Sequence, residues 1–196
     1  MKRDQMRWDL KYRERKFDPA QGANTILKRY LRFLPRGKVL DLAAGEGRNA
    51  VFLAEHGFEA EAVDISPIAM SRARKSARAH GVTIRTVAGD LDTYLIRPGH
   101  YDVILNFYFL DRGLIPRIKK GLKKGGMVVF ETYTAEQKKL RTGGPGQHKY
   151  VLKPNELLRL FRGFHVLFYR EGVFREGGKR RAIASLIARK QVRGQR

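Results

Sequence analysis

The residues best suited to bind a ligand stand in the first third of the chain. Asp41 ends a short apolar run, Gly45 and Gly47 follow it, and Asp64 ends a second apolar run. Glycines let a backbone turn sharply and approach a ligand closely. The pattern predicts a strand, a glycine turn, a helix over residues 48–56 and a second strand. The amino end of that helix would then face the ligand.

Two kinds of ligand compete for this turn. The segment Gly45-Glu-Gly47-Arg-Asn-Ala50 fits the G-x-G-x-x-G/A fingerprint of dinucleotide-binding folds, and Asp64 lies about twenty residues on, where a ribose-binding carboxylate belongs. Asp41 stands where a pyrophosphate would lie, and its charge would repel that group. S-adenosylmethionine instead brings a sulfonium and an ammonium to this place, and no phosphate. The residues therefore predict S-adenosylmethionine as the cofactor.

Strands and helices are expected to alternate after Asp64. Ser66 caps a helix with Pro67 at its first position, and a small-residue face suited to a sheet follows. Further strands are expected at 83–87, 101–106 and 127–132, with a helix over 111–123 before the last of them. This order requires a parallel sheet with right-handed crossovers.

The two ends of the chain have a different pattern. Residues 154–161 are predicted to be a helix, and strands at 165–169 and 182–188 form an antiparallel hairpin around a basic turn at 172–181. The polar connection 135–153 is expected to be a mobile loop at the mouth of the site. Near the amino terminus, Trp8 and Tyr12 share one side of a helix, which either packs on the domain or closes over the cofactor as a lid.

Composition limits the classes of protein that fit. We expect one domain over residues 1–190, with an amino-terminal helical segment or lid at 1–36, a Rossmann-like core at 37–190 and a basic tail at 191–196. The chain has no cysteine, which excludes disulfides and cysteine nucleophiles, and no metal is expected. No signal peptide or membrane span is visible, so we expect a cytoplasmic protein. The net charge of +22 would attract polyanions, and weak RNA binding is expected.

These motifs together resemble the class I S-adenosylmethionine-dependent methyltransferases over nearly the whole chain. The matching features are the glycine turn, the acidic residues Asp64 and Asp90, Asn106-Phe107 after the fourth strand, and the final hairpin. The resemblance implies an α/β fold with a doubly wound, mostly parallel seven-stranded sheet and an antiparallel carboxyl-terminal hairpin. Ala43 departs from the family, which usually has glycine there.

The resemblance also implies roles for individual residues. Those expected to hold the cofactor are Asp41, Ala43, Gly45, Gly47 and Asn49 around the methionine part, Asp64 at the ribose, Ile65, Asp90 and Leu91 at the adenine, and Asn106 and Phe107 beside the sulfonium. Within the class, residues 150–161 and 184–190 are most similar to the tellurite-resistance methyltransferase group. A His-Arg pair associated with oxyanion binding in that group is absent, and Phe174-Arg175 stands at the nearest place.

The methyl acceptor is less well defined. We expect a small molecule, either a chalcogen oxyanion or a thiol. The candidates for its pocket are Tyr108, Arg112, Tyr133, His148 and Arg175, with Glu131 as a further pocket residue or a buried hydrogen-bonded carboxylate. The alternative is an RNA methyltransferase acting on a ring nitrogen or a ribose, which only the positive charge favours. A nucleic-acid-binding module without catalysis is a third class.

Overall fold

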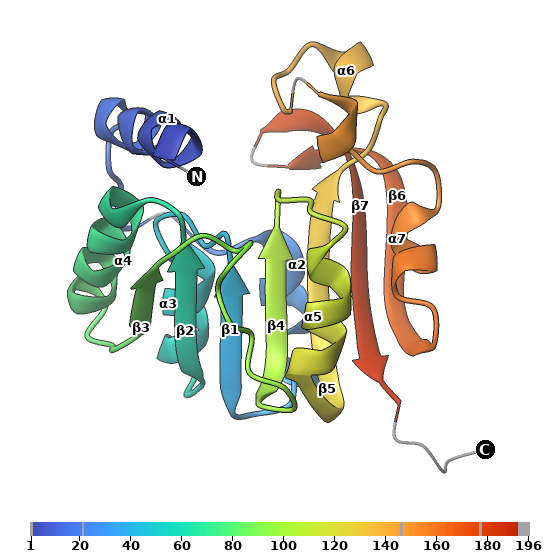
Figure 1. Ribbon diagram of the computed structural model, residues 1–196, viewed down its shortest axis with the longest axis horizontal. Coiled ribbons are helices and arrows are strands. Elements are labelled where there is room, and N and C mark those ends of the chain that lie inside the picture. Colours follow the sequence, from blue (N-terminus) through green and yellow to red (C-terminus); the bar gives the residue numbers. More distant parts are fainter. Residues whose placement is uncertain (1, 21, 146, 177, 192–196) are drawn as a thin grey trace.

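The computed structural model describes residues 2–20, 22–145, 147–176 and 178–191, and is organised around one seven-stranded sheet with the order β3-β2-β1-β4-β5-β7-β6 (Figure 1). The strands are β1 Lys38–Leu42, β2 Glu59–Asp64, β3 Arg85–Ala88, β4 Tyr101–Phe107, β5 Leu122–Tyr133, β6 Phe164–Glu176 and β7 Lys179–Lys190. The first five strands are parallel and β7 is antiparallel to both of its neighbours. The predicted fold class is confirmed.

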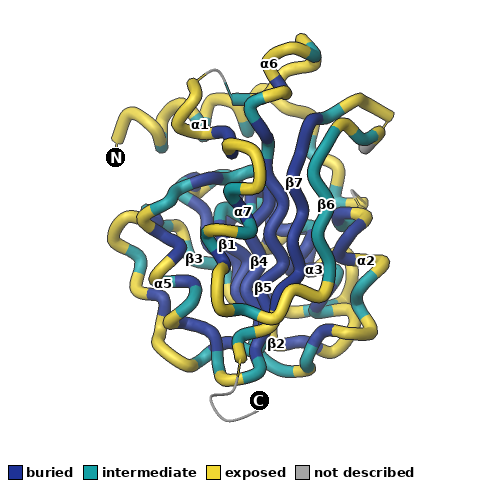
Figure 2. Tube along the Cα trace, turned by 90° about the vertical axis from the view of Figure 1, so that its right-hand side faces the viewer, coloured by how far each residue is buried: buried dark blue, intermediate teal, exposed yellow. Residues whose placement is uncertain are grey.

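Helices cover both faces of the sheet. The helices of the structure are α1 Lys2–Glu14, α2 Thr25–Tyr30, α3 Arg48–Glu55, α4 Pro67–Ala79, α5 Leu114–Gly121, α6 Gln137–Leu140 and α7 Glu156–Leu160, with short 3-10 turns at Leu31–Phe33 and His148–Tyr150. Apolar side chains of α2, α3 and α4 pack on one face, and those of α5 and α7 pack on the other. The inner strands β1, β2, β4, β5 and β7 are mostly buried, whereas the edge strands β3 and β6 are half-buried or exposed (Figure 2).

Local sequence signals explain how α4 begins and packs. The Ser66 hydroxyl accepts a hydrogen bond from the Ala69 amide at 3.1 Å, and Pro67 occupies the first turn. Ala69, Ala73 and Ala77 are buried, as a flat helix–sheet contact requires. Asn24, by contrast, makes no capping bond with its side chain at the start of α2, because its oxygen accepts instead from the Arg48 guanidinium.

The carboxyl-terminal hairpin is longer than the sequence predicts. The expected turn at 172–181 is wrong, since β6 continues to Glu176 and β7 starts at Lys179. Basic side chains on an exposed, paired segment resemble a loop in composition, which hides the strand. The pairing continues to Glu176 opposite Lys179, so Arg175 and Arg181 both lie on strands.

The connection 135–153 is also more regular than a mobile loop. It contains α6 and the turn at His148–Tyr150, and Thr134 pairs with Leu152 in an isolated parallel bridge. Gln137 is buried and anchors it, because its side-chain oxygen accepts from the Ala182 amide at 2.8 Å while its nitrogen donates to the Gly143 carbonyl at 2.7 Å. Among the described residues, no helix is long and apolar enough to cross a bilayer.

Candidate functional site

The site lies at the carboxyl edge of the central strands. In the sheet β1 stands between β2 and β4, so the ends of these strands bring Asp41, Asp64 and Asn106 to one edge. Parallel α/β sheets bind ligands at this edge, where the strand order reverses. In this sheet the reversal falls between β1 and β4.

The turn after β1 has the backbone conformation that its glycines predict. Gly45 and Gly47 have φ values of 58° and 75°, and Ala43 adopts the same left-handed region at 51°. Left-handed conformations are costly for residues with a Cβ, so Ala43 strains the position where related proteins usually have glycine. The Gly45 position is also crowded, because a Cβ there would lie 2.7 Å from the Tyr12 hydroxyl oxygen.

Asp64 connects the end of β2 to this turn. Its carboxylate accepts from the Gly45 amide at 2.8 Å and from the Ser66 amide at 2.9 Å. Burial raises the pKa of Asp64, and these amide bonds oppose that effect. A carboxylate has about four lone-pair sites, so these bonds leave room for hydroxyl donors of a ligand.

Asp41 is almost completely buried, and one of its oxygens has no hydrogen-bond partner among the described residues. The Ala50 amide donates to the carboxylate. Burial raises the pKa of Asp41 to about 7, although the nearby Arg48 guanidinium acts in the other direction. A buried, incompletely paired carboxylate at this edge has the chemistry to pair with a cation such as an ammonium.

The other predicted cofactor residues have different surroundings. Asn106 is buried and donates to the Phe109 carbonyl at 2.7 Å, while Phe107 packs in the apolar layer with α2 and α3. Asp90 accepts from the Asp92 amide at 2.9 Å. Ile65 is half-buried and Leu91 is buried. Asn49 accepts from the Asn24 amide at 3.0 Å, so its side chain fixes the amino-terminal segment to α3.

Two of the predicted acceptor residues lie together. The rings of Tyr108 and Tyr133 are 5.2 Å apart between centroids, and the Tyr108 hydroxyl donates to Glu131 at 3.0 Å. Burial, and then the Glu131 carboxylate, raise the pKa of Tyr108 far above its usual value. Tyr108 also has a φ of 57°, an unusual conformation for a bulky residue. Its hydroxyl therefore stays protonated at a strained strand end.

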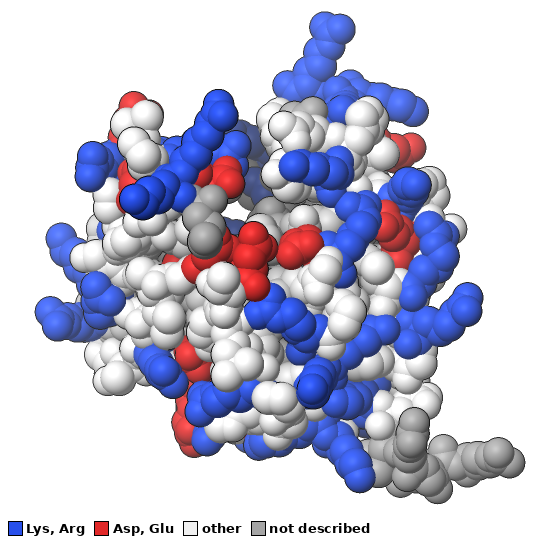
Figure 3. Space-filling model, in the orientation of Figure 1, with Lys and Arg blue, Asp and Glu red and all other residues white. Residues whose placement is uncertain are grey.

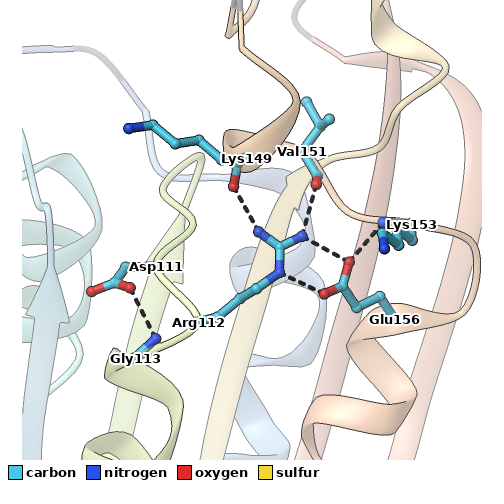
Figure 4. A network of polar contacts seen from close by, with 7 residues as sticks. All are labelled: Asp111, Arg112, Gly113, Lys149, Val151, Lys153 and Glu156. Carbon is cyan, nitrogen blue, oxygen red and sulfur yellow. Dashed lines mark hydrogen bonds and ion pairs between the residues drawn. The ribbon is translucent and has the colours of Figure 1, made fainter.

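The other acceptor candidates lie elsewhere. Arg112 forms an ion pair with Glu156 at 2.6 Å and donates to the carbonyls of Lys149 and Val151, as Figure 4 shows. This network joins the start of α5 to α7 and leaves the guanidinium committed to protein groups. His148 and Arg175 are exposed, Arg175 close to the tip of the hairpin.

Two arginines that were not predicted as site residues approach Tyr108. The Arg181 guanidinium lies over the Tyr108 ring, 4.9 Å from its centroid. Burial lowers the pKa of Arg48, with smaller effects from Tyr108, Asp41 and Arg181, which places these groups near one another. The position of Arg48 directly after the glycine turn could have identified it as a site residue from the sequence. Arg181 lies in the segment predicted to be a turn, so the sequence provided no reason to place it in the site.

Acidic and basic side chains are distributed unevenly over the surface. Figure 3 shows acidic side chains gathered over the middle of the molecule, with Lys and Arg on both flanks. Two open recesses are also present. The larger, of about 450 Å³, is lined by Arg48 and other residues of α3 together with residues between Pro19 and Leu31, so it adjoins the site through Arg48. The smaller, of about 340 Å³, lies at the amino edge of the sheet. Among the residues that the structure describes, no group of three or more side chains is arranged to hold a metal.

Comparisons with known proteins agree with this geometry. A methyltransferase-domain family model matches residues 39–126. The ribosomal protein L11 methyltransferase of Thermus thermophilus is 37% identical over 106 residues, which cover 53% of this chain and 41% of that protein. TehB of Haemophilus influenzae is 26% identical over 168 residues, covering 79% of this chain and 57% of TehB. The chain thus spans less than two thirds of the length of these relatives.

Solved structures have the same fold. The crystal structure of TehB from Haemophilus influenzae aligns with a TM-score of 0.74 and 20% identity, covering 88% of this chain and 64% of TehB. The sheet order, the glycine turn and the family match over residues 39–126 make this chain similar to the class I S-adenosylmethionine-dependent methyltransferases, whose cofactor is S-adenosylmethionine. Within the class, the chain is similar to TehB in sequence and in fold, which supports the predicted tellurite-resistance group.

Proposed function

We propose that the protein transfers a methyl group from S-adenosylmethionine to a small-molecule acceptor. The observation that carries this proposal is the buried carboxylate of Asp41, which directly precedes the glycine turn. One of its oxygens has no hydrogen-bond partner among the described residues. A dinucleotide would bring phosphate to this position and be repelled. S-adenosylmethionine brings an ammonium, which compensates the buried charge.

The chain offers groups for each part of the cofactor. Asp41 would hold the ammonium of S-adenosylmethionine. Arg48 lies near Asp41 and would pair with the carboxylate at the same end of the cofactor. Asp64 would accept from the ribose hydroxyls with its remaining lone pairs. Asp90 and Leu91 would contact the adenine from the segment after β3.

Positioning and exclusion of water would supply most of the acceleration. When bound, S-adenosylmethionine supplies a methyl group on a sulfonium, which leaves as a neutral thioether when an acceptor lone pair attacks the methyl carbon. The protein therefore has to align the acceptor and keep water out. Tyr108 is unsuited to act as a base, because its raised pKa keeps the hydroxyl protonated.

Helix α1 would serve as the lid over this site. None of its residues is buried, so few apolar contacts fix it in place. It is held by polar contacts instead: the Ser66 hydroxyl donates to Asp9, and Arg72 donates to the Arg15 carbonyl just after the helix at 3.0 Å. Trp8 and Tyr12 stack at 6.0 Å on the side facing the domain.

A chalcogen oxyanion or a thiol is the acceptor we propose. The similarity to TehB supports this class of acceptor. Methylation of RNA is the second candidate, and the net charge of +22 favours it. A relative from Alcanivorax borkumensis, 31% identical over 100 residues that cover 31% of its length, is named as a ribosomal RNA small subunit methyltransferase.

Calorimetry and an acceptor screen test this function. S-adenosylhomocysteine and S-adenosylmethionine should bind, whereas NAD should not. Radiolabelled donor should then label selenite, tellurite or a thiol and leave RNA unlabelled. Tight NAD binding without binding of either adenosyl ligand would overturn the assignment of the site. Label on one RNA nucleotide, with no turnover of small anions, would promote the second candidate.

A further inference from the structure

Arg181 occupies a distinctive place at the carboxyl edge of the sheet. It is the third residue of β7, which is antiparallel to β5 and so begins where β5 ends. Its half-buried guanidinium stacks over Tyr108, which in turn contacts Tyr133. This aromatic support holds a cation at the end of β4, and the reacting centre is proposed to lie there.

Among the described residues, no carboxylate oxygen lies within 4.0 Å of the Arg181 or the Arg48 guanidinium nitrogens. The nearby Glu131 carboxylate already accepts from Tyr108 at 3.0 Å and from Ser185 at 2.6 Å, and Arg170 pairs with it at 3.4 Å. Glu131 therefore has its hydrogen-bond and ion-pair partners without Arg181.

The two guanidiniums also affect each other. Burial lowers the pKa of Arg48, Tyr108 and Asp41 oppose this effect, and the positive charge of Arg181 adds to it. Two half-buried cations near each other favour a bound anion. Arg48 adjoins Asp41 and the glycine turn, on the side proposed for the cofactor carboxylate. Arg181 lies on the opposite side, against the tyrosines.

We propose that Arg181 is the specificity residue for the methyl acceptor, and that it binds a negatively charged oxygen group of that acceptor. The inference rests on the proposed methyl transfer and deepens it, because it requires the acceptor to be anionic. An acceptor whose attacking atom has a free lone pair at neutral pH, such as the selenium of selenite, needs no base, which agrees with the protonated Tyr108 hydroxyl. Arg181 thus replaces Arg112, His148 and Arg175 as the acceptor-binding cation.

Binding to the protein saturated with S-adenosylhomocysteine tests this role directly. The probes are selenite and 3-mercaptopropionate, titrated by calorimetry at constant ionic strength into the wild type, Arg181→Gln and Arg180→Gln. Arg180 is the neighbouring exposed residue, so its variant carries the same change of charge. We expect Arg181→Gln to weaken both anions by about tenfold or more, and Arg180→Gln to leave them unchanged. Arg181→Lys should recover part of the affinity, because it keeps the charge but not the planar fork.

Kinetics separate acceptor recognition from a general structural effect. For Arg181→Gln, the KM for 3-mercaptopropionate should rise while the KM for neutral 2-mercaptoethanol stays constant. Equal weakening in both Gln variants, undiminished anion binding by Arg181→Gln, or no anion binding by the wild type would each overturn the inference. S-adenosylhomocysteine affinity, measured first in every variant, distinguishes this failure from failure of the proposed function, since only the latter abolishes cofactor binding.

Discussion

A buried carboxylate with an unpaired oxygen is costly to the folded protein, and Asp41 is such a group. Its raised pKa means that folding favours its protonated form. Stability from this group is therefore greatest at low pH and falls as pH rises from 3.8 through about 7. A bound ammonium would lower the pKa of Asp41, because it favours the ionised carboxylate. The proposed cofactor would thus supply a partner for the unpaired oxygen.

This linkage predicts that cofactor affinity depends on pH. S-adenosylhomocysteine should bind more tightly as pH rises from 5.5 to about 7, by up to about tenfold per pH unit, and the gain should level off above 7. Calorimetry across this range measures the effect. Asp41→Asn should bind weakly and show no such rise. A wild-type affinity that stays constant over the range would rule out Asp41 as the ammonium partner.

Asp64 is predicted to support both the turn and the cofactor. Asp64→Asn keeps an oxygen for one backbone amide but removes the charge, so S-adenosylhomocysteine binding should weaken by about 1–3 kcal/mol. Asp102→Asn is the matched control, because Asp102 also accepts a backbone amide, that of Lys38 at 2.8 Å. The control should lower the melting temperature without changing affinity. If Asp64→Asn behaved like the control, Asp64 would be a turn residue alone.

At the scale of elements, α1 contributes little apolar burial and is predicted to open easily. Asp9→Ala removes its contact with Ser66, so S-adenosylhomocysteine should dissociate several-fold faster in stopped-flow experiments. The melting temperature should barely change, because no residue of α1 is buried. Asp4→Ala is the control, since the ion pair of the Asp4 carboxylate among the described residues lies within the helix, with Arg7 at 3.3 Å. Equal dissociation rates in the two variants would contradict the lid.

The hairpin shows why elements have to be seen in their tertiary setting. Strand β7 is buried from Ala182 to Ala188 between β5 and β6, and this buried part is what the sequence identifies as a strand. Its first residues, Lys179 to Arg181, are charged and read as a turn. Cross-strand pairing with β6 extends the ladder there and brings Arg181 toward Tyr108.

For the whole molecule, the charge of +22 is predicted to matter for polyanions and not for catalysis. Scattered Lys and Arg side chains should give weak RNA binding that falls by orders of magnitude between about 50 and 200 mM salt. Methylation of a small anion should change only a few-fold over that range, and cofactor affinity should barely move. Fluorescence anisotropy with labelled single-stranded RNA and steady-state kinetics measure the two quantities. RNA affinity that persists at high salt would favour the RNA-methylating alternative.

The amino-acid sequence by itself determined the features that depend on neighbouring residues. Three features follow from local backbone preference and apolar periodicity: the strand, glycine turn and helix after Val39, the Ser66-Pro67 start of α4, and the alternation of strands and helices along the chain. These features were enough to predict the fold and the edge of the sheet at which the cofactor is proposed to bind. Trp8 and Tyr12 were also placed correctly on one side of their helix.

Only the tertiary structure decided which charged side chains remain available for a ligand. Arg112 carries a charge that suits an anionic acceptor, but its guanidinium already pairs with Glu156 of α7 and donates to carbonyls in the segment before α7. Arg48 and Arg181 lie far apart in the chain, and they meet because β1 and β7 end and begin at the same edge of one sheet. The charge of a residue is local information, whereas its partners depend on contacts between distant segments, which no spacing in the sequence records.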